Sequence, residues 1–374
     1  MFNFMNSRFF KIYVIPGAVF QSVMVGGGYG TGREIVEYFT SHGFMGGLMG
    51  LGIAFVCMAV VVALTFEFSR LTKAYDYRNF FKNLLGPAWV AFEVLIILLF
   101  LLILAVLASA AGNILQDNFG ISYGVGLSIM LVVIGTLTFF GRDVIAKVLT
   151  FWTFFLYAVF FAFFITVFNQ EWSSISAAIQ QAEVLPGWWQ SGFKYALYNI
   201  AVAPLLLYVC REFETRKQAF ASGVIAAAIA MVPALFFQIA FFAAYPAILD
   251  QAIPVYWMMG QLGMTVLLVL YSVMLFGTFI ETGAGMLQGI NERIDAWVIE
   301  KRGTGLSRGL HASIAVAAIL VSALISLWGI TSLIAKGYST MSYGFLVVYV
   351  LPLVTIGVYK IFKADKIASE EQTG

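Results

Sequence analysis

The chain contains about ten apolar stretches, each near the roughly 20 residues that a helix needs to cross the hydrocarbon core of a bilayer. Hydrophobic residues make up 61% of the 374 residues and charged residues only 11%, whereas a soluble domain is nearer half apolar and a quarter charged. A soluble fold cannot hide so much apolar surface, but lipid can cover it. We therefore predict an all-α polytopic membrane protein with spans near residues 10–40, 45–70, 88–116, 121–140, 143–168, 191–211, 217–244, 258–292, 309–328 and 341–362.

The positions of the basic residues predict how these spans are oriented. Cytoplasmic loops of multi-pass proteins collect Lys and Arg. With the N-terminus inside, almost every basic residue falls on the cytoplasmic side, and only Arg33, Lys194 and Lys336 fall elsewhere. We therefore expect a protein of the cell (plasma) membrane with both termini in the cytoplasm. The opposite loops carry the acidic residues Asp117, Glu171, Glu183 and Asp250.

The first span is interrupted by glycine. Residues 26–32 read Gly-Gly-Gly-Tyr-Gly-Thr-Gly, and each glycine weakens a helix by up to about 1 kcal/mol relative to alanine. Freed backbone groups at membrane depth are tolerated where they line a cavity or are buried in protein. Thr31 and Glu34 have the spacing of a capping box, which would start a second half-helix at Thr31. We predict a break here in preference to a glycine face for close helix packing.

The sixth span carries a second interruption. Asn199 is a polar residue in an apolar helix, and Pro204 removes a helix hydrogen bond. A break is favoured over a simple proline kink. Interrupted helices at matching places in two halves of a chain indicate a transporter binding site of the inverted-repeat type. We expect one transmembrane domain over residues 1–374, with a first repeat at about 10–168, an inverted second repeat at about 191–362 and a cytoplasmic tail at 363–374.

A family resemblance supports this organisation. Residues 26–36, Gly-Gly-Gly-Tyr-Gly-Thr-Gly-Arg-Glu-Ile-Val, resemble the first-helix motif of the YkvI-like bacterial membrane proteins. Residues 335–338 and 349–353 resemble the last helix of that group, which is placed in the amino acid–polyamine–organocation superfamily with its LeuT-type fold. Gly27, Tyr29, Gly30 and Arg33 stand where Ala, Phe, Ala and Gln are common. The resemblance implies alternating access, a site between the first and sixth helices, an amino-acid-like or other small nitrogenous substrate, and coupling to sodium or protons.

The two breaks supply the candidate substrate site. Backbone N–H groups near Thr31 and Gly32 are candidates for binding a carboxylate, because helix N-termini attract anions. Tyr29, Tyr195, Tyr198 and Asn199 are candidates for walls or gates, although each could equally be ordinary packing. The full set of predicted substrate-binding residues is Gly26, Gly27, Gly28, Tyr29, Gly30, Thr31, Gly32, Tyr198 and Asn199, with Arg33 and Tyr195 as gates.

The eighth span supplies the candidate ion site. Thr278 and Thr282 are one helical turn apart and share a face. The resemblance implies that they match the hydroxyl residues that hold sodium in LeuT-type transporters. Glu281 lies between them, and an acid inside a membrane span is by default a functional hypothesis: a sodium ligand or a proton carrier. Its alternative is a structural hydrogen bond, or pairing with Arg33 or Lys194.

The remaining charged residues of the spans have simpler interpretations. Arg33 and Glu37 are one turn apart, so we expect a local ion pair, although Arg33 could also attract an anionic substrate. Glu67 lies close to Arg70, which favours a structural pair, and Lys194 is expected to extend its charge to the interface.

Several functions are weighed from these patterns. The first is a secondary active transporter, and the alternatives are an uncoupled facilitative permease and a solute sensor without transport. An enzyme is disfavoured, because the chain offers no His pair, nucleophile elbow or metal cluster, and no cofactor is expected beyond a coupling ion. Cys57 and Cys210 fit neither a disulfide framework nor zinc. The expected partners are a small-molecule substrate and the lipid bilayer, with no nucleic acid; the oligomeric state is left open.

Overall fold

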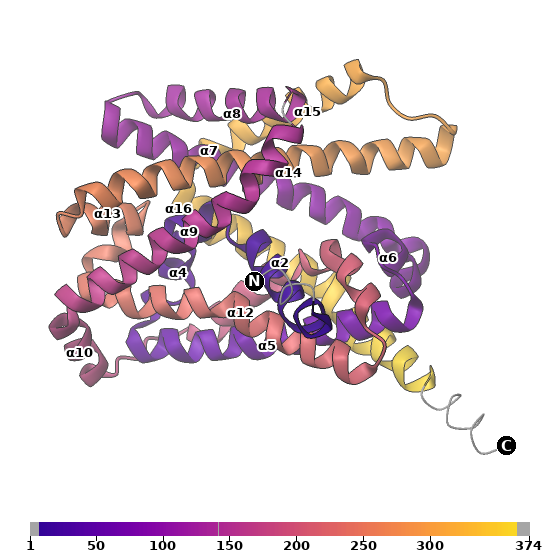
Figure 1. Ribbon diagram of the computed structural model, residues 1–374, viewed down its shortest axis with the longest axis horizontal. Helices are drawn as coiled ribbons and strands as arrows, with labels where there is room; N and C mark the ends of the chain where they lie inside the picture. Colours follow the sequence, from indigo (N-terminus) through magenta and orange to yellow (C-terminus); the bar gives the residue numbers. More distant parts are fainter. Residues whose placement is uncertain (1–6, 141, 365–374) are drawn as a thin grey trace.

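A computed structural model describes residues 7–140 and 142–364, with side chains described at 7–136 and 155–364. All regular elements in these ranges are helical (Figure 1). The first half contains η1 (Phe10–Val14), α2 (Ile15–Met24), α3 (Gly27–Thr31), α4 (Arg33–Tyr38), η2 (Thr40–His42), α5 (Phe44–Thr72), α6 (Tyr77–Leu85), η3 (Gly86–Trp89), α7 (Val90–Phe119), α8 (Tyr123–Phe140), α9 (Arg142–Gln170) and α10 (Trp172–Gln181).

The second half continues the helical pattern, with several short 3-10 and π segments. It contains α11 (Trp188–Ile200), η4 (Ala203–Glu212), α12 (Arg216–Phe241), η5 (Phe242–Ala244), η6 (Ala247–Asp250), α13 (Pro254–Gln261), α14 (Thr265–Arg302), α15 (Arg308–Ser326), α16 (Ile330–Ser332), η7 (Leu333–Tyr338), α17 (Ser339–Phe345), η8 (Leu346–Val350) and η9 (Leu353–Gly357).

The predicted spans each have an apolar helical segment in their place. By length and composition, six helices of the described chain could cross a membrane, and up to eight could do so if two bent pairs each count as one span. The bent pairs are Phe155–Gln170 with Trp172–Gln181, and Trp188–Ile200 with Ala203–Glu212. The shorter apolar helices Phe10–Met24 and Tyr123–Thr136 stand at the first and fourth predicted spans.

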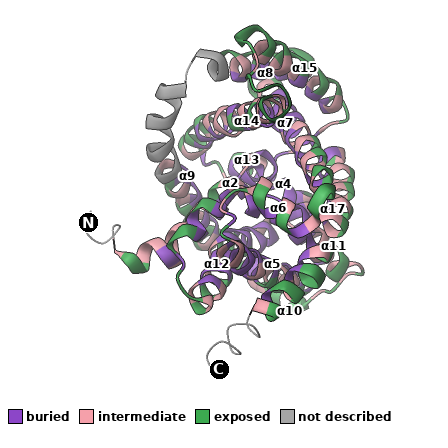
Figure 2. Ribbon diagram, turned by 90° about the vertical axis from the view of Figure 1, so that its right-hand side faces the viewer, coloured by how far each residue is buried: buried purple, intermediate pink, exposed green. Residues whose placement is uncertain are grey.

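The outward faces of these helices carry large apolar side chains. Val132, Phe161 and Leu324 are each more than 60% exposed. Figure 2 shows buried residues facing the centre of the molecule and exposed residues on its outside. An apolar surface of this extent is unfavourable in water and favourable against lipid, so it fits a protein embedded in a bilayer.

The helices form two groups that pack mainly within themselves. In the first group, which we call the bundle, α12 packs on α5 and α2, and α11 packs on α5. In the second group, the scaffold, α7 packs on α8, α14 and α15. Figure 1 shows α7, α8, α14 and α15 on one side of the molecule and α5 and α12 on the other. The short helix α3 follows α2 of the bundle in the chain and packs against α7 and α14 of the scaffold. It therefore joins the bundle to the scaffold.

The predicted break in the first span is confirmed, and it is double. Helix α2 ends at Met24, and Gly26 is extended with φ −101° and ψ −159°. The second kink is at Gly32, whose φ of +83° is in the left-handed region that favours glycine. A side chain there would also collide with Phe241 of α12, because an added Cβ would lie 2.5 Å from its ring. Five residues of helix thus stand between two backbone breaks.

The break in the sixth span is also confirmed. Helix α11 ends at Ile200, two turn residues follow, and the chain continues as the 3-10 helix η4, bent by 62°. Pro204 lies in the first turn of η4, where its missing N–H costs no helical hydrogen bond. Both interruptions therefore lie in the bundle, on the paths of α2 to α4 and of α11 to η4.

Candidate functional site

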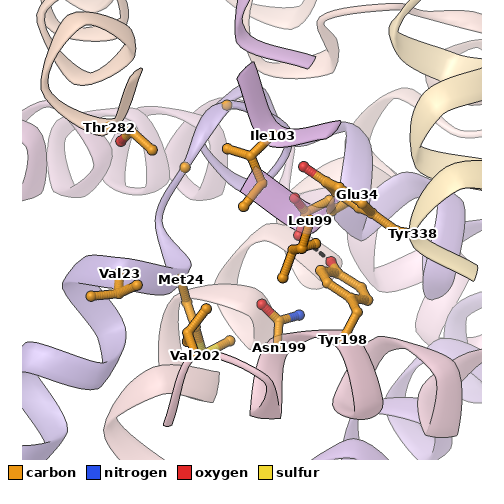
Figure 3. A pocket seen from close by; sticks show the side chains of 12 residues that line it. Val23, Met24, Glu34, Leu99, Ile103, Tyr198, Asn199, Val202, Thr282 and Tyr338 are labelled. Atoms are coloured by element: carbon orange, nitrogen blue, oxygen red, sulfur yellow. Dashed lines mark hydrogen bonds between the residues drawn. The ribbon is translucent and has the colours of Figure 1, made fainter. Parts of the chain in front are cut away.

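A small cavity lies where the two broken helices meet. The space in it that a water-sized molecule can occupy is about 30 Å³, room for one or two water molecules. Its walls come from both the bundle and the scaffold, as Figure 3 shows. The lining residues are Val23, Met24, Gly26, Gly27, Glu34, Leu99, Ile103, Tyr198, Asn199, Val202, Thr282 and Tyr338.

Glu34 is the acidic residue of this cavity. Its side chain is 3% exposed and accepts a hydrogen bond from the hydroxyl of Tyr198. Figure 3 shows these two side chains pointing toward each other, one from each broken helix. The carboxylate also lies against the first turn of α3, where the Tyr29 backbone N–H faces it. A Cβ on Gly28 would come within 2.8 Å of Glu34 Cγ, so glycine is needed for this close approach.

The predicted capping box between Thr31 and Glu34 is wrong. The outer half-helix α4 begins at Arg33 after Gly32, and the Thr31 hydroxyl instead donates to the Gly28 carbonyl at 2.8 Å. Glu34 reaches back farther, to the start of α3. The open backbone donors are therefore near Gly27 to Tyr29, not near Thr31 and Gly32, and a carboxylate of the protein already faces them.

Tyrosines form the wall of the cavity around Glu34. The rings of Tyr198 and Tyr338 are stacked, with centroids 4.6 Å apart. Tyr38 lies beside Tyr198 and donates to the Ile334 carbonyl at 3.1 Å, which ties α4 to the last span. Asn199 lines the cavity, while its amide donates to the Tyr195 carbonyl at 3.0 Å. A carboxylate beside tyrosine rings is an environment that favours a cationic group.

A second small cavity contains the predicted ion residues. Thr278, Glu281 and Thr282 line it together with Ser22, Val25, Leu156 and Tyr157. The Thr278 hydroxyl donates to the Met274 carbonyl at 2.9 Å, which leaves its oxygen lone pairs available to a cation. Thr282 lines both cavities, and the consecutive residues Val25 and Gly26 of the unwound segment line the second and the first cavity.

The alternative partners of Glu281 are engaged elsewhere. Arg33 pairs with Glu37 at 2.9 Å, and the Lys194 ammonium lies over the Tyr343 ring at 5.7 Å. No ion pair of Glu281 is found within the part of the chain whose side chains are described. Hydroxyl and carboxylate oxygens are the ligands that hard cations such as sodium prefer, and an unpaired carboxylate can also take a proton.

Arg33 is the first residue of α4, next to Glu34, but its side chain binds other parts of the protein. Besides the predicted ion pair with Glu37, its Nη1 donates to the carbonyls of Leu249 at 2.6 Å and Gln251 at 3.1 Å. The residue is 5% exposed. It therefore fastens α4 to η6 and the turn after it. The structural pair of Glu67 and Arg70 is also confirmed, at 2.7 Å.

The structure brings only part of the predicted substrate set to the cavity. Gly26, Gly27, Tyr198 and Asn199 line it, whereas Tyr29 packs on Phe237 of α12 and Tyr195 packs on Phe39. Gly28, Gly30, Thr31 and Gly32 lie behind the lining. Sequence reasoning missed Glu34 and Tyr338 as lining residues. Glu34 is an acidic residue within an apolar span, which could have indicated a functional role. Its capping-box spacing with Thr31 favoured a structural role instead.

Comparison with known proteins places this arrangement in a class. A solved structure of a Na⁺-coupled sialic acid symporter, in a substrate-bound outward-open state, matches the chain with a TM-score of 0.60. The match covers 89% of this chain and 78% of that chain at 15% sequence identity. The chain therefore has the LeuT-type fold of membrane transporters. It is also a distant homologue of the uncharacterized membrane protein YkvI of Bacillus subtilis (strain 168), being 22% identical over 314 residues that cover 81% of this chain and 86% of YkvI. No protein-family model matches the chain.

Proposed function

We propose that the protein is a secondary active transporter that moves a small nitrogenous solute across the membrane by alternating access. The observation that carries the proposal is the carboxylate of Glu34 in the cavity between two broken helices. A buried carboxylate whose hydrogen-bond donors are all neutral binds a cation more readily than an anion. The solute is therefore an amine or an amino acid whose ammonium group faces Glu34.

The size of the cavity fits a contracted state of such a transporter. Pockets that enclose a small organic ligand are commonly of order 300 Å³ or more, far above the space present here. Because the walls belong to both bundle and scaffold, a shift of one group against the other would enlarge the cavity. Movement of one group of helices around a fixed site is the general mechanism of alternating access.

Coupling is proposed at the second cavity. Thr278 and Thr282 would contribute hydroxyl ligands to a sodium ion, and Glu281 would complete the site or carry a proton in place of sodium. Occupation of this cavity would fix Val25, which is next in the chain to Gly26 of the substrate cavity, and Thr282, which lines both cavities. An uncoupled permease or a non-transporting sensor remains the alternative function on the same fold, and neither would need this second site.

The test is a thermal-shift measurement with matched compounds: an amino acid, the amine left after decarboxylation, and the acid left after deamination. Ligands that bind only the native state raise its stability by about 2.7 kcal/mol at 100 times Kd. We expect hits only among compounds with a protonated nitrogen. In Glu34→Gln, affinity should fall at least about tenfold, or 1.4 kcal/mol.

The matched control is Glu171→Gln, which removes a carboxylate from a loop next to α10 and should bind as the parent protein does. Stabilisation by acids that lack nitrogen, or equal binding by Glu34→Gln, would contradict the assignment of Glu34. The melting temperature of each variant without ligand separates loss of binding from loss of folding.

A further inference from the structure

A groove outside both cavities lies at the end of the helices where α7 begins and α14 ends. The space in it that a water-sized molecule can occupy is about 180 Å³. Its walls are Trp89, Val90 and Ile97 on one side and Ile294 and Trp297 on the other, and its floor is Glu93 with Arg293. The charge pattern of the sequence puts this end on the cytoplasmic side. Tryptophan is typical of the membrane–water interface, so the groove is expected at headgroup depth.

The charges at the floor are satisfied within the protein. Arg293 pairs with Glu93 at 3.3 Å and lies 3.9 Å over the ring of Tyr77, whose hydroxyl donates to Glu93 at 3.2 Å. Arg293 and Glu93 have side chains only 6% and 13% exposed. Because the charges of Glu93 and Arg293 at the floor neutralise each other, the groove does not require a charged ligand. Its apolar walls suit a hydrocarbon chain.

The rim of the groove is basic. Arg78 and Lys82 of α6 lie 5.0 Å and 5.3 Å over the Trp89 ring, and Lys301 lies 4.4 Å over the Trp297 ring. Glu300 balances only one charge, although it contacts both Arg78, at 3.3 Å, and Lys82, at 3.1 Å.

Two of these cations have a charge or a hydrogen-bond donor without a partner in the described part of the chain. Lys301 makes no ion pair within the part of the chain whose side chains are described, and Nη2 of Arg78 is buried with no hydrogen-bond acceptor there. The rim therefore carries an excess of positive charge above an apolar channel.

We propose that this groove binds an anionic phospholipid, with one acyl chain between Trp89 and Trp297 and the phosphate against Lys82, Lys301 and Arg78. Basic pockets between transmembrane helices on the cytoplasmic side bind acidic headgroups. A free phosphate would use only the rim and leave the apolar walls exposed, which favours the lipid as occupant. The site joins α7, which lines the substrate cavity through Leu99 and Ile103, to α14, which carries Glu281.

The test is the melting temperature of the full chain in nanodiscs of phosphatidylglycerol or of phosphatidylcholine with the same acyl chains. We expect phosphatidylglycerol to raise the melting temperature of the parent protein by several degrees relative to phosphatidylcholine. The double variant Lys82→Gln/Lys301→Gln should lose this difference. Lys336→Gln, which removes an exposed lysine from the last span, should keep it.

A third variant tests the apolar part of the site. Val90→Trp fills the groove and should also lose the preference, while its melting temperature in phosphatidylcholine reports whether it still folds. Equal stability of the parent protein in the two lipids, or a preference that survives in the double variant, would overturn the proposal. Stabilisation in phosphatidylcholine by glycerol phosphate alone, to the same extent, would also overturn it, because the ligand would then be a soluble phosphate.

Discussion

At the scale of single residues, the position of Glu34 depends on a glycine. The carboxylate can lie against the first turn of α3 only because Gly28 has no side chain. Gly26 is also in the break but has open space, since an added Cβ would meet only Thr282, at 3.8 Å. Gly26 and Gly28 belong to the same glycine run, but only at Gly28 would an added methyl group collide with Glu34.

The close contact at Gly28 predicts different outcomes for two alanine substitutions, one there and one at a glycine with open space. Gly28→Ala should displace Glu34 and weaken amine binding at least about tenfold, because the methyl group takes the space of the carboxylate. The control Gly52→Ala, on an exposed face of α5 where an added Cβ has no neighbour within 4 Å, should keep affinity within about twofold of the parent value. Titration of both purified variants with the same amine decides the matter. Equal affinities for the two variants would show that Glu34 does not need its place beside α3.

The role of a residue could be predicted from the sequence only where it depends on residues close to it in the chain. Tyr198 and Asn199 follow from their place at a predicted break, and both line the cavity. Glu34 was interpreted through Thr31, three residues before it, whereas its hydrogen bond is with Tyr198, 164 positions away. A helix-capping rule considers only neighbours in sequence, so it could not detect that contact.

At the scale of elements, α4 is fastened to the segment after α12 by one arginine in its first turn. Arg33 donates to two carbonyls near η6 and pairs with Glu37, and this joins the outer half of the first span to the segment between α12 and α13. The next residue, Glu34, lines the cavity. We propose that these contacts make Arg33 a latch on the outer side of the cavity; its role as a gate stays a prediction.

Arg33→Gln should therefore open the outer side of the cavity. Hydrogen bonds to a charged group contribute about 1.5–3 kcal/mol each, so the open state should gain at least tenfold in population. The readout is the rate at which Ile103→Cys, on the cavity wall, reacts with an impermeant maleimide added from outside, in a background without Cys57 and Cys210. Lys194→Gln is the control, since that ammonium lies over Tyr343 instead. An unchanged rate in Arg33→Gln would show that the contact is not a latch.

The elements themselves followed closely from the sequence, because long apolar runs and dense glycine have strong local consequences. Both broken spans were predicted. The sequence did not indicate that α3 would form a separate helix of five residues, since its helical state depends on packing against α7 and α14. Helices α6 and α10 lie between predicted spans, and the sequence analysis does not predict them.

At the scale of the whole molecule, the two cavities lie along the boundary between bundle and scaffold. Glu34, Tyr198 and Asn199 come from the bundle, while Leu99, Ile103 and Thr282 come from the scaffold. Relative movement of the two groups would change both cavities together. The alternation of charged loops supports the predicted division into spans but contains no information on which helices pack together. The inverted repeats and the orientation of the termini stay predictions.

The most direct test of this account is uptake of the amine found by thermal shift into proteoliposomes, measured with a sodium gradient, a pH gradient or neither. We expect accumulation against the amine gradient with one of the two driving gradients and none without, and no uptake by Glu34→Gln. Thr278→Ala should abolish accumulation if sodium drives it, and Glu281→Gln should abolish it if protons do, while both variants still bind the amine. Binding without uptake, or uptake that only equilibrates the amine whatever the gradient, would contradict the coupled transporter and leave a sensor or a facilitative permease on the same fold.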